Sequence, residues 1–259
     1  MTVTTETFPG FDGAPLVLLR LEPRESAAPL RTVVLLHGLF SNADVNWVRF
    51  GTAARLADAG FTCLMPDLRA HGGSAAPHDP AAYPADVLAR DLAALVDHCA
   101  LVDFDLVGFS LGARTAARAV IGGLRPHRLV LAGMGLEGLA GWAGRQDFFR
   151  DVIDRFGTIR PGDPAYMAQQ FLKTTAVDRV AARLLLGTME DTAPAALAMI
   201  TMPTLVLCGD QDNDNGSADR LAEALPHATR ATILGTHMSS VTLPDLGEAL
   251  AAWLAQGRE

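Results

Sequence analysis

Residues 104–112 read Phe-Asp-Leu-Val-Gly-Phe-Ser-Leu-Gly, an apolar run that ends in a G-x-S-x-G pattern. The run Phe104–Val107 predicts a buried strand, and a helix is predicted over Ser110–Ile121. A serine on so tight a strand-to-helix turn needs small neighbours, which the two glycines of the pattern provide. The turn would expose the Ser110 hydroxyl at a helix N-terminus, where backbone N–H groups favour negative charge. We therefore predict that Ser110 is a nucleophile rather than a simple helix N-cap.

Similar apolar runs recur along the chain, with helical patterns between them. Most runs are apolar on successive residues, which is typical of parallel strands covered on both faces. Strands that alternate with helices predict an α/β fold with a mostly parallel, twisted sheet and helices on both faces. The other predicted strands are Leu16–Leu21, Arg31–Leu36, Phe61–Met65, Arg128–Ala132, Thr204–Cys208 and Ala231–Leu234. The other predicted helices are Val48–Ala59, Pro84–Ala100, Ala218–Leu225 and Leu246–Gln256.

Residues 136–199 interrupt this alternation. They contain no convincing strand, but Arg145–Arg155 and Pro164–Lys173 have helical patterns. A crossover between parallel strands needs far fewer residues than this segment supplies. We therefore expect a core domain formed by residues 1–135 and 200–259, with residues 136–199 inserted as a helical cap.

Composition narrows the class of protein. Hydrophobic residues make up 49% of the chain and the net charge is -8, without long basic runs. This balance argues against nucleic acid and anionic membrane surfaces as partners. Met1–Pro9 lacks the regions of a signal peptide, and no apolar run reaches about 18 residues, so we expect a cytoplasmic protein. Cys63, Cys99 and Cys208 are expected to be buried free thiols.

A nucleophilic serine needs a histidine base that a carboxylate orients. His237 follows the last predicted strand, at the sheet edge where open α/β sheets place their sites. Asp210, Asp212 and Asp214 follow the strand before it and reach the same edge, so each is a candidate acid. The histidines in polar or helical surroundings are interpreted as surface residues: His78, His98, His127 and His227.

Two alternative sites are disfavoured. The alternating aspartates from Asp210 resemble the start of a calcium loop, but Gly216 comes one position too late and Leu221 stands where a glutamate is required. The turn after the strand Arg31–Leu36 reads His-Gly-Leu-Phe, which is not a dinucleotide-binding glycine pattern. We expect neither a metal ion nor a cofactor.

Together these features resemble the α/β-hydrolase fold superfamily, in its branch of small serine esterases, lipases and related hydrolases with a helical cap. The resemblance extends from about Leu16 to Leu254. It is carried by the segments 37–40, 67–74, 108–112 and 209–213, and by His237.

The resemblance implies roles for particular residues. Asp212 would be the acid of the triad, with Asp210 as the alternative, and the N–H groups of Leu39 and Leu111 would form an oxyanion hole. His37 would brace its loop, while Asp67 and Arg69 would hydrogen-bond neighbouring loops. The superfamily usually shows Asp-x-Arg-Gly-x-Gly-x-Ser at residues 67–74, whereas this chain has Ala70 and His71 in the middle.

The expected chemistry is hydrolysis of a carboxylic ester through an acyl-enzyme on Ser110. No charged cluster stands out in residues 136–199, so a small molecule with a neutral, apolar group is the expected partner. A homodimer is also considered. Cleavage of a carbon–carbon bond, acyl transfer or perhydrolysis on the same triad, and a receptor without turnover stay open as alternatives. Four side chains are expected to line the substrate pocket: Phe40, Met134, Trp142 and Met238.

Overall fold

The computed structural model describes residues 2–23 and 31–256. An eight-stranded sheet forms its centre, in the order β1-β2-β4-β3-β5-β6-β7-β8. From β4 to β8 all pairs are parallel, which confirms the predicted α/β class with a mostly parallel sheet. The strands are β1 Val3–Pro9, β2 Pro15–Leu21, β3 Arg31–Leu36, β4 Phe61–Pro66, β5 Phe104–Phe109, β6 Arg128–Ala132, β7 Thr204–Gly209 and β8 Ala228–Ile233.

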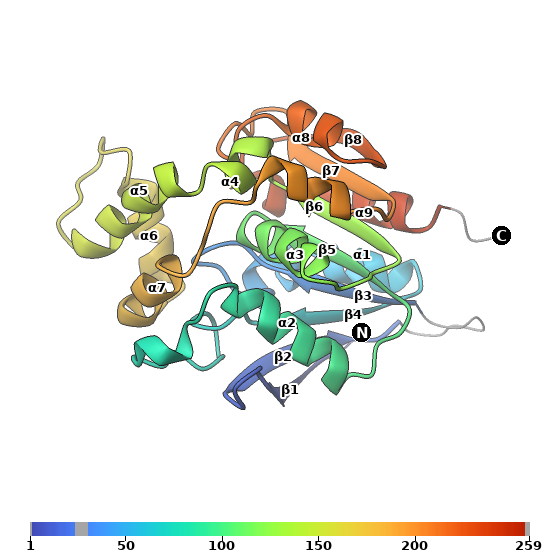
Figure 1. The fold of residues 1–259 in the computed structure, drawn as a ribbon, viewed down its shortest axis with the longest axis horizontal. Helices are drawn as coiled ribbons and strands as arrows, with labels where there is room; N and C mark the ends of the chain where they lie inside the picture. The colour runs from blue at the N-terminus through green and yellow to red at the C-terminus, as the bar shows by residue number, and fades with distance from the viewer. Residues whose placement is uncertain (1, 24–30, 257–259) are drawn as a thin grey trace.

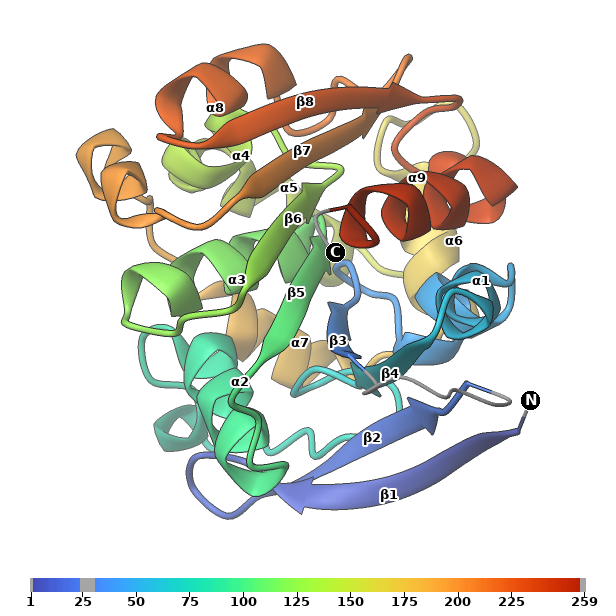
Figure 2. The ribbon, with the colours of Figure 1, turned by 90° about the vertical axis from the view of Figure 1, so that its right-hand side faces the viewer.

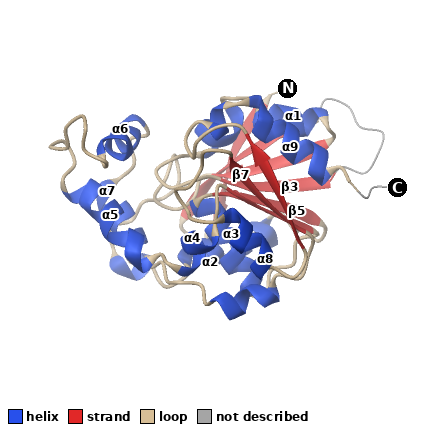
Figure 3. Cartoon of the chain, turned by 90° about the horizontal axis from the view of Figure 1, so that it is seen from above, coloured by secondary structure: helices blue, strands red, loops and turns tan. Residues whose placement is uncertain are grey.

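The helices cover both faces of this sheet. In Figure 3 α1 and α9 lie on one side of the sheet, and α2, α3 and α8 lie on the other. Buried apolar side chains form one cluster on each face, so the central strands are covered on both faces of the sheet. The helices are α1 Thr52–Asp58, α2 Val87–His98, α3 Leu111–Ile121, α4 Leu136–Ala140, α5 Ala143–Asp154, α6 Tyr166–Thr174, α7 Arg179–Leu186, α8 Ala218–Ala224 and α9 Pro244–Leu254. Shorter helical turns are η1 Asp44–Val48, η2 Pro80–Ala82, η3 Pro194–Met199 and η4 Ser240–Thr242.

The N-terminal edge of the sheet differs from the prediction. The strand over residues 16–21 was expected to be parallel, but β2 runs antiparallel to both β1 and β4. β1 was not predicted at all. Most of its side chains are exposed, so it lacks the apolar run that revealed the other strands. Figure 2 shows β1 and β2 as a ribbon at this edge.

Two predicted helices begin later in the structure than in the sequence pattern. The chain forms the π-helical turn η1 before Gly51, which has a φ of 82° and precedes α1. Asp86 adopts a left-handed conformation with a φ of 55°, so α2 begins after it and not at Pro84. Cys63 and Cys208 are buried free thiols as expected, whereas Cys99 is only half-buried.

Residues 136–199 carry α4 to α7 and η3, and no strand occurs within this segment. α5, α6 and α7 gather at one end of the molecule, away from the helices on the sheet (Figure 1). Their apolar side chains form a third cluster, which also includes Phe40 from the core. α4 packs instead against α8. The two-domain division stays a prediction, and residues 1, 24–30 and 257–259 of its core lie outside the described residues. Within the described residues, no helix is both long and apolar enough to cross a membrane.

Candidate active site

Ser110 lies on a strained turn between β5 and α3. Its φ of 53° and ψ of -110° are rare for a residue with a side chain. The turn is held because the Ser110 N–H donates to the Ala132 carbonyl at 2.9 Å. It also requires both flanking glycines. A Cβ on Gly108 would lie 2.3 Å from the Gly112 backbone, and one on Gly112 would lie 2.1 Å from the Leu36 oxygen.

The structure brings Ser110, His237 and Asp212 together from three separate strand ends. His237 Nε2 lies 3.1 Å from Ser110 Oγ, and His237 Nδ1 lies 2.9 Å from Asp212 Oδ2. The Asp212 side chain is 2% exposed and the His237 side chain is 12% exposed. With Nδ1 donating to the carboxylate, Nε2 is free to accept the hydroxyl proton of Ser110, so one hydrogen-bond chain runs from Asp212 through His237 to Ser110.

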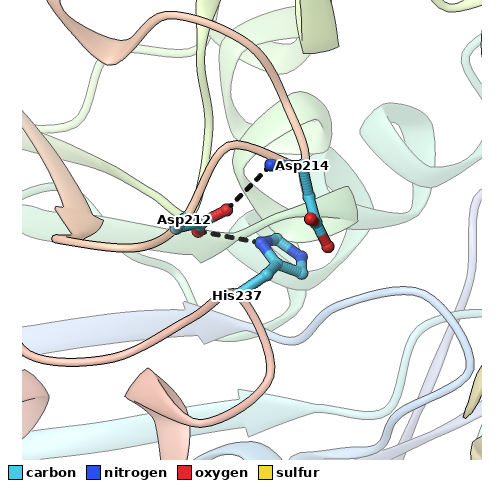
Figure 4. A group of neighbouring side chains, drawn as sticks. All are labelled: Asp212, Asp214 and His237. Atoms are coloured by element: carbon cyan, nitrogen blue, oxygen red, sulfur yellow. Dashed lines mark hydrogen bonds and ion pairs between the residues drawn. The ribbon is translucent and has the colours of Figure 1, made fainter.

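The loop after β7 carries Asp210, Asp212 and Asp214 and is called the acid loop below. Asp210 and Asp214 have different neighbours from Asp212. Asp210 Oδ1 accepts a 2.8 Å hydrogen bond from the Gly235 N–H, so Asp210 braces the loop that carries His237. Asp214 donates its N–H to Asp212 Oδ1 at 3.2 Å, and Figure 4 shows its side chain beside the His237 ring. The geometry therefore favours Asp212 over Asp210 as the partner of His237.

Asp212, Asp214 and His237 also bring ligand-type atoms within 4.8 Å of one another. However, both oxygens of Asp212 already accept hydrogen bonds, one from His237 and one from the Asp214 N–H. His237 uses its two ring nitrogens for Asp212 and Ser110. These hydrogen bonds thus occupy most of the atoms that a metal ion would need.

The loop after β3 lies beside Ser110. A Cβ on Gly38 would meet the Ser110 Cβ at 3.5 Å. Phe40, with a φ of 59°, donates its N–H to His71 Nε2 at 3.1 Å. Among the described residues, no group accepts a hydrogen bond from the N–H of Leu39 or of Leu111. Both amides are therefore available for an oxyanion, as the sequence predicts for them.

The buried imidazoles of His37 and His71 stabilise the loop after β3 through hydrogen bonds to its backbone. His37 donates from Nδ1 to the Gly38 carbonyl at 2.8 Å and accepts from the Leu68 N–H at 2.9 Å. The two imidazoles are buried, with ring centroids 5.2 Å apart. Burial lowers the pKa of His37 to about 4, and burial together with His37 lowers the pKa of His71 to about 3. Both rings are therefore neutral near pH 7, and each Nε2 can accept a backbone N–H.

The segment after β4 fixes the loops around the site. Asp67 accepts the N–H of Ala43 from Oδ1 and the N–H of Gly73 from Oδ2, each at 2.8 Å. Arg69 is fully buried and pairs with Asp91 and Asp12. Sequence reasoning expected Asp67 and Arg69 to bond neighbouring loops, but it did not identify Asp91, whose position on an otherwise apolar helix face was the available signal.

The four side chains expected in the substrate pocket have different surroundings. Phe40 and Trp142 are buried in the apolar cluster of the cap, where Trp142 stacks on Phe149 at 5.8 Å. Met134 is 2% exposed and packs within the core cluster of α3. Met238 is 48% exposed beside His237. Their role in substrate binding stays a prediction.

Sequence reasoning missed the contact between the cap and the acid loop. Arg145 on α5 donates from Nη1 to the Asp214 carbonyl and to Asn215 Oδ1. Asn215 in turn donates from Nδ2 to the Gly133 carbonyl at 2.7 Å. The acid loop is thus held between the cap and the end of β6.

Known proteins share this architecture. A family model described as alpha/beta hydrolase fold matches residues 31–129. An epoxide hydrolase from Caballeronia sordidicola is 34% identical over 96 residues, which are 37% of this chain and 28% of that protein. The match therefore spans less than a third of that relative.

Solved structures extend the similarity to the full fold. A hydrolase from Pseudomonas aeruginosa PA01 superposes with a TM-score of 0.73 at 22% identity, over 97% of this chain and 98% of that one. An esterase from Exiguobacterium antarcticum gives 0.72 at 17% identity, over 96% of this chain and 98% of its own. With the family-model match over residues 31–129 and this full-length structural similarity, the chain has the α/β-hydrolase fold.

Proposed function

We propose that the protein is a serine hydrolase that cleaves a carboxylic ester of a small, largely apolar molecule. The observation that carries the proposal is the continuous hydrogen-bond chain from Ser110 Oγ through His237 to Asp212, at 3.1 and 2.9 Å. A serine hydroxyl becomes an effective nucleophile when a neighbouring imidazole accepts its proton.

The reaction has two halves. His237 Nε2 takes the proton of Ser110 as its oxygen attacks the acyl carbon, and the anionic oxygen binds the amides of Leu39 and Leu111. His237 then protonates the leaving alcohol, so that the ester bond breaks and an acyl-enzyme remains. A water molecule, deprotonated by the same nitrogen, releases the acid and restores Ser110. Asp212 keeps Nδ1 protonated throughout and stabilises the imidazolium.

A panel of p-nitrophenyl esters of increasing acyl length tests the proposal. Turnover should be rapid for the wild type and should fall by about four orders of magnitude or more in Ser110→Ala, because the nucleophile is lost. A fluorophosphonate should label the wild type at Ser110, as read by peptide mass spectrometry. Thermal melting should show that Ser110→Ala is folded.

Rival reactions are outcomes of the same experiment. The similarity to an epoxide hydrolase makes styrene oxide a necessary additional substrate. Turnover of the epoxide without turnover of any ester would overturn the proposal. Activity on a vinylogous diketone alone would favour carbon–carbon cleavage, and ligand binding without any turnover would favour a receptor.

A further inference from the structure

Arg114 is a buried cation one turn after the nucleophile. It lies on α3 and is 4% exposed. Nη1 donates to the carbonyls of Gly138 and Leu139 at 3.2 and 3.0 Å, whereas Nη2 has no partner among the described residues. Its burial lowers the pKa of the guanidinium to about 10. A buried charge without an opposite charge is strongly unfavourable, so its surroundings call for an anion.

No carboxylate of the described chain lies within ion-pair distance of Arg114. Asp86 lines the same cavity as Arg114, but it pairs with Arg118, whose Nε lies 2.8 Å from Asp86 Oδ1. Glu190 and Asp191 act on Arg114 only from a longer distance. Asp191 instead accepts a hydrogen bond from the Ala143 N–H at 3.1 Å. The protein therefore surrounds Arg114 with carbonyls but supplies no direct counter-charge.

Two further buried polar atoms near Arg114 also lack partners within the described part of the chain. These are Trp142 Nε1 and Thr192 Oγ1. Thr192 donates its own N–H to the Leu139 carbonyl at 2.9 Å, which is the oxygen that Arg114 also bonds. The Trp142 ring lies 5.5 Å from the Arg114 Cζ. Three side chains with unused hydrogen-bonding capacity thus lie at the junction of α3, α4 and the start of α5.

A small cavity adjoins Arg114 between the start of α2 and α3, and the Asp86–Arg118 ion pair lines another part of it. Leu111, Arg114 and Met189 are among its lining residues. Leu111 follows Ser110 directly and offers one of the two oxyanion amides. Residues 110 and 114 are one turn apart on the same side of the helix, and helical side chains lean toward the helix N-terminus. The Cα of Arg114 therefore lies about 6 Å along the helix axis from that of Ser110, and the Arg114 side chain leans back toward the start of α3.

We propose that this junction is a carboxylate subsite, and that the natural ester carries a second, free carboxylate that binds Arg114. The inference rests on the proposed ester hydrolysis and specifies its substrate class. Nη2 would donate to the carboxylate, with Trp142 Nε1 and Thr192 Oγ1 as additional donors. Leu111 and Met189 would contact the apolar chain between the carboxylate and the scissile carbonyl. The prediction of a neutral group came from the charges of residues 136–199 alone, whereas Arg114 reaches this junction from α3.

A matched pair of esters tests the inference. Mono-p-nitrophenyl glutarate carries a terminal carboxylate, and p-nitrophenyl 5-methylhexanoate has an isopropyl group of the same shape in its place. The wild type should show a kcat/KM at least about tenfold higher for the glutarate ester, because a hydrogen bond to a charged group is worth that much or more. In Arg114→Met this ratio should fall by about tenfold or more.

Arg125→Met is the matched control variant. Arg125 also donates from one nitrogen to two backbone carbonyls, those of Val120 and Leu124, but it lies exposed at the surface. Its replacement should leave the ratio of the two esters as in the wild type. An equal fall of the ratio in both variants would show that the preference for the charged ester does not come from Arg114.

Binding of glutarate by calorimetry separates the subsite from the chemistry. Ser110→Ala should bind glutarate, and Ser110→Ala with Arg114→Met should not. Arg114-dependent binding without ester turnover would refute the proposed function and leave the subsite standing. Ester turnover with a wild-type ratio near one would refute the subsite alone. If Arg114→Met does not fold, the inference is tested on the wild type alone. The wild type should bind glutarate more tightly than neutral glutaramide, and equal or weaker binding of glutarate would overturn the inference.

Discussion

The buried pair His37 and His71 should make the protein acid-sensitive well above the pH at which its carboxylates titrate. In the folded protein the pKa of His37 is lowered to about 4 and that of His71 to about 3. In the unfolded chain both return to about 6.5. As the pH falls below 6.5 the unfolded chain binds protons that the folded protein cannot, so the free energy of unfolding decreases. The decrease continues until the pH reaches the folded pKa values.

The size of this decrease in the free energy of unfolding depends on how far the pH lies below 6.5. At pH 5 an unfolded histidine lies about 1.5 pH units below its pKa, and each unit corresponds to about 1.4 kcal/mol. Each of the two rings should therefore reduce the free energy of unfolding by about 2 kcal/mol between pH 7.5 and pH 5. Asp67 and Asp91 act in the opposite direction, because burial raises the pKa of both carboxyl groups. The wild-type curve alone thus understates the histidine contribution.

Comparison with single variants isolates that contribution. Urea unfolding of wild type, His37→Gln and His71→Gln should be measured from pH 7.5 to pH 5. Each variant should lose less stability than the wild type over this interval, by about 2 kcal/mol. His227→Gln, at an exposed position, serves as the control. A wild-type-to-variant difference that stays constant with pH would refute the buried, neutral state of that imidazole.

Three further predictions concern the acid, the turn and a buried ion pair. Asp212→Asn should lower kcat by about four orders of magnitude, because His237 loses the partner of Nδ1, while Asp210→Asn should retain most of the activity in the same ester assay. Gly112→Ala should destabilise the protein by about 3 kcal/mol or more in urea unfolding, since its Cβ would lie 2.1 Å from the Leu36 oxygen. Gly144→Ala on α5 is the contrasting variant: its Cβ would meet nothing within 4 Å, so it should stabilise the protein by up to about 1 kcal/mol. Asp91→Ala should lower the free energy of unfolding by about 3–5 kcal/mol because it leaves the buried Arg69 without its main partner, whereas Asp12→Ala, at a more exposed pair, should cost about 1 kcal/mol or less.

The sequence predicted those site residues that directly follow a recognisable strand, because their place in the fold depends on a local sequence pattern. Ser110 and Asp212 each follow a fully buried strand, and His237 follows the short apolar stretch at the end of β8, all at one edge of the sheet. Parallel strands bring such ends together whatever the intervening segments do, so three distant residues could be expected to meet. The glycines at 108 and 112 added a steric signature that depends only on the turn itself.

Other parts depend on what packs against them, and no local pattern could reveal them. β1 is an edge strand with a mostly exposed surface, so its only structural signal is its pairing with β2. α7 has a strongly amphipathic pattern but lies in a segment without strands to frame it. Arg114 reads in the sequence as an ordinary helical arginine. In the folded protein it contacts the carbonyls of Gly138 and Leu139 and the ring of Trp142, which are far from it in the sequence.

The acid loop shows how position, rather than residue type, separates the roles of identical side chains. Asp210, Asp212 and Asp214 lie within five residues, and each could ionise. The Asp210 carboxylate accepts a hydrogen bond from the Gly235 N–H and so fixes the loop of His237. Of the three, Asp212 is the one whose buried carboxylate bonds the imidazole. The backbone of Asp214 is held by Arg145 from the cap. A movement of α5 would therefore be transmitted through Arg145 to the loop whose Asp212 carboxylate bonds His237.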